Sequence, residues 1–237
     1  MRVRLLVLLI CLFTVNACTY RGQVRQGIYQ GAALTPKVNA SVLLITDNHL
    51  APEIVITDTD NSDLQSFRLQ TQDGITAAVT DALGTLFTQA NSGSVALQAN
   101  YNFVAQVTVE AGLTRNNCEG ELARWVVRRE GLCTLVTLAL HQPDGKEITQ
   151  AKASRWREFR TPGFASSVRW FNRHTFIFSP VLTPVYMQSQ GNALRKQFED
   201  NLTEALEDIM SQLAQKRGLF GTHAPNKTSA TAQNYVE

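Results

Sequence analysis

The sequence predicts an α+β fold, with an antiparallel or mixed sheet and two main helices packed on one of its faces. Two observations predict this class. Several short segments are β-branched or alternate polar and apolar residues, and two longer segments repeat apolar residues at helical spacing. The 237 residues, of which 44% are hydrophobic and 18% charged, suffice for one globular domain.

The expected strands lie between turn residues such as proline, glycine and aspartate. They are residues 40–46, 53–57, 66–70, 101–111, 121–127, 132–141 and 147–159. The segment PDGK at 143–146 is a strong turn signal between the last two strands.

The two helices are expected at residues 73–90 and 192–215, where apolar side chains form a continuous stripe. Thr71 or Asp73 can cap the first helix, because a short side-chain oxygen accepts from free backbone N–H groups. Gly218 is expected to end the second helix.

The amino terminus has the order of a secretion signal. Two arginines precede an apolar run at residues 5–13, and small residues lead to Cys18. The run is about half of the ~20 residues that a membrane-spanning helix needs. The tetrad VNAC at 15–18 resembles a lipobox, a motif whose cysteine is acylated before the signal is cleaved. This resemblance implies that residues 1–17 are removed and that Cys18 carries lipid, palmitate included. The alternative is an ordinary cleaved signal followed by an incidental cysteine.

The rest of the chain divides by composition. Residues 18–39 have no sustained periodicity and are expected to be a membrane tether. Residues 40–217 are expected to form one periplasmic α+β domain. The polar residues 218–237 are expected to be a disordered tail.

The four cysteines have different expected fates. Cys11 leaves with the signal and Cys18 takes the lipid. Cys118 and Cys133 remain, in a compartment where disulfides persist, and a bridge between them would contribute about 3 kcal/mol. A metal site is the rival interpretation, but two thiols without nearby histidines are poor zinc ligands.

Charge and motifs argue against several classes of function. Without Arg2 and Arg4 the chain has 20 basic and 20 acidic residues, so nucleic-acid binding is not expected. The acidic loop from Asp58 begins like a calcium loop but has Asp63 at the position of the required glycine. No serine elbow, phosphate loop or dinucleotide fingerprint occurs, so we expect neither an enzyme nor a cofactor or metal.

Arginine and aromatic residues gather between residues 155 and 187. Such residues are common at binding hot spots, and Arg157, Trp170, Phe171 and Arg173 are the candidates for partner contact. The structural alternative is that the tryptophans pack in the core while the arginines extend outward. Because prolines interrupt residues 176–187, a long connection is expected there instead of a helix.

With the segment VNAC at 15–18 and this order of elements, the chain resembles small outer-membrane lipoproteins of the YajG-like type. It resembles more loosely the TolB N-terminal and curli-secretion-lipoprotein modules. The resemblance covers residues 40–46, 73–90, 101–111 and 192–215; the cysteine pair and residues 164–190 depart from it. It implies a non-catalytic role at the periplasmic face of the outer membrane, because lipoproteins kept at the inner membrane usually have Asp where this chain has Thr19.

The leading hypothesis is therefore a binding or assembly factor for a secretion, surface-appendage or envelope-maintenance complex. Its sheet edge or the arginine-aromatic segment would contact a protein partner, and oligomerisation is left open. One alternative is an envelope hydrolase that uses His141 or His174 with a carboxylate and a serine. Another is a module that binds glycan or lipopolysaccharide through Arg157, Trp170 and Arg173.

Overall fold

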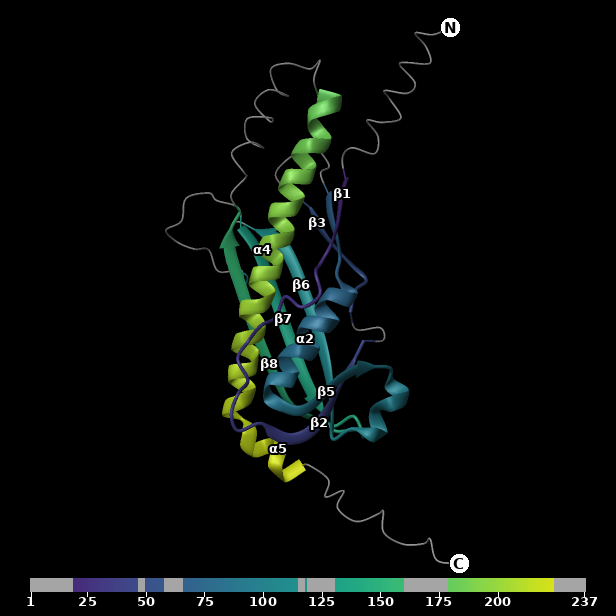
Figure 1. Cartoon of the computed structure of the whole chain (residues 1–237), viewed down its shortest axis with the longest axis vertical. Helices are drawn as coiled ribbons and strands as arrows, with labels where there is room; N and C mark the ends of the chain where they lie inside the picture. Colours follow the sequence, from purple (N-terminus) through teal and green to yellow (C-terminus); the bar gives the residue numbers. More distant parts are fainter. Residues whose placement is uncertain are drawn as a thin grey trace, which may run out of the picture.

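The computed structural model describes residues 19–46, 50–57, 66–114, 118, 131–159 and 179–223. It has the expected α+β class, with two helices lying along one face of a mixed sheet (Figure 1). The strands are β1 (Thr19–Gln23), β2 (Val38–Ile45), β3 (Glu53–Thr57), β4 (Ser66–Gln70), β5 (Phe87–Gly93), β6 (Phe103–Thr114), β7 (Gly131–His141) and β8 (Glu147–Glu158). The helices are α2 (Gln72–Leu86), the 3-10 helix η1 (Val95–Asn100), α4 (Ser179–Gln215) and α5 (Arg217–His223).

The strands form two sheets. The larger has the order β5-β2-β6-β7-β8, in which β2 is parallel to both neighbours and β6, β7 and β8 are antiparallel. The smaller has the order β1-β4-β3, with β1 parallel and β3 antiparallel to β4. Because β3 also contacts β6, the small sheet lies beside one end of the large one (Figure 1).

The main core lies between the large sheet and the helices. Strand β2 shows how the strand pleat divides the sheet: Val42 and Leu44 join this core, whereas Leu43 and Ile45 face the other side. There they form a small separate cluster with Val104. The stripe of α4 predicted from the sequence lies in the main core, as do the apolar positions of α2.

The expected tether at residues 18–39 is wrong for residues 19–39. Residues 19–23 are strand β1, and Tyr20, Val24 and Tyr29 are buried in the main core. No local pattern indicates this strand, because the pairing partner of β1 is β4, from which it is separated by more than forty residues. A tertiary contact orders a segment that has no periodicity of its own.

Each of the two long helices has a glycine where this amino-terminal segment crosses it. A Cβ on Gly74 in α2 would lie 2.6 Å from the carbonyl oxygen of Val24. A Cβ on Gly191 in α4 would overlap the ring of Tyr20. In both helices glycine lowers the helix propensity, but it allows the amino-terminal segment to pass close to the helix backbone.

The first helix is shorter than predicted. It ends at Leu86, and Phe87 begins β5, which pairs in parallel with β2. Thr71 does occupy the N-cap position, but its hydroxyl donates to the carbonyl of Ala51 and makes no capping hydrogen bond. That contact joins the start of α2 to the loop before β3.

The last long helix begins thirteen residues before the predicted start, at Ser179. The expectation that proline excludes a helix here is wrong. Pro180 lies in the first turn, where the backbone N–H groups have no partner within the helix, and Pro184 removes one N–H donor near the start of a helix of 37 residues.

The boundary of the predicted tail at residue 218 is also wrong. Gly218 does not end the helical structure, because α5 continues to His223 and buries Phe220. The Phe220 ring lies 5.5 Å from that of Phe87 and 5.7 Å from that of Phe103, measured between centroids. The predicted strand 121–127, the acidic loop 58–63 and residues 224–237 lie outside the described residues.

The glycine contacts predict opposite effects of the same substitution at two positions of α2. Gly74→Ala should lower the free energy of unfolding by about 1–3 kcal/mol, because the new methyl group overlaps Val24. Gly84→Ala is the control, with nothing within 4 Å of its added Cβ, and should raise it by about 0.5–1 kcal/mol. Urea unfolding measures both, and equal effects would contradict the described crossing of Val24.

The aromatic contacts predict that Phe220→Ala lowers the free energy of unfolding by about 3–5 kcal/mol. Leu219→Ala is the matched control, since Leu219 is 43% exposed and its loss should change stability by less than about 0.5 kcal/mol. If both variants unfold at the wild-type urea concentration, α5 is not part of the core.

Candidate functional site

The candidate site is the end of the molecule at which β1 begins (Figure 1). Thr19, the first described residue, pairs with Ser66, which in turn pairs with Thr57. The amino-terminal half of α4 extends along the same end (Figure 1). Cys18 lies outside the described residues, but the chain that follows it enters the sheet at once.

Tyr20 attaches the start of β1 to α4. Its hydroxyl donates to Oδ1 of Asn192 over 3.0 Å, and its ring packs on Gly191 and lies 6.3 Å from the ring of Phe67. Burial raises the pKa of Tyr20, the charge of Arg195 opposes this shift, and the charge of Glu199 adds to it. The side chain is therefore a neutral hydrogen-bond donor at physiological pH.

A second attachment is a buried carboxylate. The side chain of Glu199 in α4 is 3% exposed and accepts three hydrogen bonds from one residue, Arg25. The donors are the backbone N–H at 3.0 Å, Nε at 2.9 Å and Nη2 at 2.6 Å. The hydrogen bond and charge of Glu199 raise the pKa of Arg25. Together with Tyr20, this contact fixes both ends of the segment 20–25 on α4.

The expected disulfide between Cys118 and Cys133 is present. The sulfur atoms lie 2.04 Å apart and the Cα atoms 5.3 Å apart. Cys133 lies near the start of β7, where the chain coming from Cys118 enters the sheet again. The bridge thus closes the connection between β6 and β7 at the same end of the molecule as the start of β1.

Arg157, a predicted partner-binding residue, contacts α4 in the structure. Its guanidinium pairs with Asp200 over 3.4 Å and with Glu204, while Arg155 pairs with Glu204 and Asp208. Trp170, Phe171 and Arg173 lie outside the described residues, so their relation to Arg157 stays a prediction.

The same face of α4 covers the edge strand β8. Gln197 donates to the carbonyls of Arg157 and Glu158, and Gln212 donates to the carbonyl of Lys152 over 3.0 Å. These side chains occupy the backbone acceptors that an added strand would use. A partner strand could pair with β8 only by displacing α4.

A cleft of about 360 Å³ opens between the small sheet and the start of α2. Its lining includes three amides and two carboxylates that can hydrogen-bond hydroxyl or cationic groups. The lining residues are Gln23, Pro52, Glu53, Gln70, Gln72 and Asp73. Glu53 is already engaged by Arg68, at 2.9 Å.

His141, the described histidine of the hydrolase hypothesis, ends β7 opposite Glu147 of β8. Its Nε2 is buried and has no hydrogen-bond partner in the described part of the chain. His174 lies outside that part. Within residues 19–223 as described, no group of three or more histidine, cysteine or acidic side chains is placed to hold a metal ion.

Among the described helices, none is long and apolar enough to cross a membrane. No protein-family model matches the chain, and a comparison with curated proteins finds no significant match.

Two features of this end were not predicted from the sequence. Arg25 and Glu199 are 174 positions apart, and no periodic pattern links such distant residues. Arg21 and Arg68 lie side by side in β1 and β4 because of a parallel pairing that the sequence did not indicate.

The raised pKa of Tyr20 and that of Tyr29, raised mainly by burial, predict a loss of stability in alkali. The unfolded chain ionises its tyrosines near pH 10.0, while the folded chain keeps these two protonated. Their contribution is therefore complete below that pH and falls as the pH rises through the folded pKa values. Unfolding free energies between about pH 8 and about pH 11 measure the fall.

The Tyr20→Phe/Tyr29→Phe double variant should lose less stability over this pH range than the wild type, although it starts from a lower value without the Asn192 hydrogen bond. Tyr101→Phe is the control, because Tyr101 belongs to the small cluster on the other face of the sheet. Parallel curves for wild type and double variant would show that neither buried phenol drives alkaline unfolding.

Proposed function

We propose that this chain is a lipoprotein held at the periplasmic face of the outer membrane by acyl chains on Cys18. Its folded body would act as a non-catalytic binding or assembly factor for an envelope complex. The observation that carries the proposal is the position of β1, whose first residue directly follows the cysteine of a lipobox-like segment.

The attachment of β1 makes such an anchor mechanically effective. Tyr20 and Arg25 join residues 20–25 to α4, the longest helix of the described chain. A lipid on Cys18 would thus hold the whole body at the bilayer surface, without a flexible spacer. More than one acyl chain is needed for lasting attachment, since each buried CH₂ contributes about 0.8 kcal/mol.

The proposed role of the folded body is to hold its sheet and helix faces at a fixed distance from the membrane. With the amino-terminal end at the membrane, the opposite end, which carries α5 and the β7–β8 turn, faces away from it (Figure 1). A partner in the envelope would meet the sheet and helix faces at a fixed height. A fixed height requires an anchor that is joined to a strand of the fold and not to a tether.

Metabolic labelling with palmitate tests the anchor. Cys18→Ser should lose the label and leave the membrane fraction, because the acylated sulfur is gone. Cys11→Ser is the matched control within the predicted signal. It should keep the palmitate label and stay in the membrane fraction. Label that persists in Cys18→Ser would overturn the proposal.

Cross-linking in intact cells tests the partner. Trp170→Ala and Arg173→Ala should reduce the captured partner if the arginine-aromatic segment forms the contact surface. Arg157→Ala removes the ion pairs with α4. Thermal unfolding measures that loss of stability separately from any loss of the cross-linked partner. Unchanged cross-links in the two segment variants would exclude that surface.

A further inference from the structure

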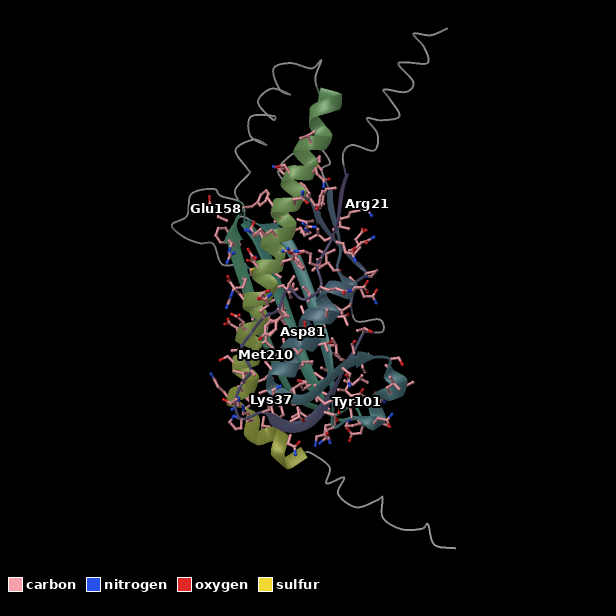
Figure 2. All side chains as sticks on the ribbon, viewed as in Figure 1. Arg21, Lys37, Asp81, Tyr101, Glu158 and Met210 are labelled. Atoms are coloured by element: carbon pink, nitrogen blue, oxygen red, sulfur yellow. A yellow bond between two sulfur atoms is a disulfide. The ribbon has the colours of Figure 1, made fainter. Side chains whose placement is uncertain are left out.

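The outer face of the small sheet carries two adjacent arginines. Strand alternation turns Tyr20 and Phe67 into the core, and therefore turns their neighbours Arg21 and Arg68 outward. The two arginines are register partners in β1 and β4, and Val55 of β3 continues their row. Figure 2 shows Arg21 on the outer side of the body, near the end where β1 begins.

The charges of this row are not balanced. Arg68 pairs with Glu53 over 2.9 Å, and both side chains are partly exposed. Arg21 is exposed and makes no ion pair with any residue that the structure describes. Like charges on neighbouring strands, about 4.8 Å apart, disfavour the pairing, and Glu53 neutralises only one of these two charges.

Three other arginines that the structure describes near this end have partners. Arg25 is bound by Glu199, and Arg155 and Arg157 are bound by carboxylates of α4. Arg21 is thus distinguished from these three arginines, because its guanidinium forms no ion pair within the described part of the chain. It lies three residues after Cys18, a span of at most about 11 Å even in a fully extended chain.

We propose that Arg21 and Arg68 bind the phosphate groups of anionic membrane phospholipids. The proposal rests on the proposed anchoring at Cys18, which would bring this row to the level of the headgroups. Guanidinium groups bind phosphate oxygens through paired N–H donors, and each basic residue near an anionic surface contributes about 1 kcal/mol. The two guanidinium groups would then contact the headgroups beside the anchor and fix the orientation of the body.

The test uses the mature chain from Cys18 onward, which contains every described residue. The Cys18 thiol is alkylated with one myristoyl-length chain, so anchoring is reversible and a second contribution can be measured. Partitioning is compared between vesicles of phosphatidylcholine alone and vesicles of phosphatidylcholine and phosphatidylglycerol in equal parts. Because the chain is attached chemically, the result does not depend on whether cells acylate Cys18.

Arg21→Gln should weaken partitioning into the anionic vesicles about fivefold and leave the neutral vesicles unchanged. Lys146→Gln is the control, since it removes the same charge from the exposed β7–β8 turn at the other end. Circular dichroism verifies that both variants are folded.

Three outcomes would overturn the proposal. They are equal partitioning of the wild type into both vesicles, an equal loss in Arg21→Gln and Lys146→Gln, and full suppression of the preference by inorganic phosphate at constant ionic strength. The last would identify free phosphate as the ligand. Failure of the anchor itself would instead be seen as retained palmitate label in Cys18→Ser.

Discussion

The contact between Glu199 and Arg25 is the constraint on which the arrangement of this protein depends. A carboxylate whose side chain is 3% exposed requires hydrogen-bond donors, and within the described part of α4 the nearest cation, Arg195, lies 4.0 Å away, too far for a hydrogen bond. Arg25 provides three donors from another segment of the chain. Helix α4 can therefore bury this face only when the amino-terminal segment lies on it. The same requirement places β1, and with it the residue after Cys18, against the longest helix.

Helix α4 links three parts of the structure. It receives the amino-terminal segment through Tyr20 and Arg25, it buries an apolar stripe on the large sheet, and its polar face covers the edge of β8. The ion pairs of Arg155 and Arg157 belong to this last contact. Arg155 and Arg157, which resemble a binding surface in the sequence, thus join β8 to α4. Arg21, in a segment without a recognisable pattern, has no ion pair among the described residues.

The candidate site was only partly predictable. The spacing of Cys118 and Cys133 and the compartment implied by the amino terminus were enough to predict their disulfide, which the structure contains. Arg21 gave no signal, because β1 is five residues long and its role depends on the parallel partner Arg68. Short strands have too few positions for alternation to be distinguished from chance.

The sequence by itself determined the class of the fold, β3 and β4, the turn at Gly145 and the apolar stripe of α4, because each depends on neighbours within a few residues. Only the tertiary structure decided the rest. Tyr20, Val24 and Tyr29 are part of the core, Phe87 begins a strand, and Phe220 packs against two other phenylalanines. Each of these depends on a partner far away in the chain, so the free energy that orders them becomes available only when distant segments meet.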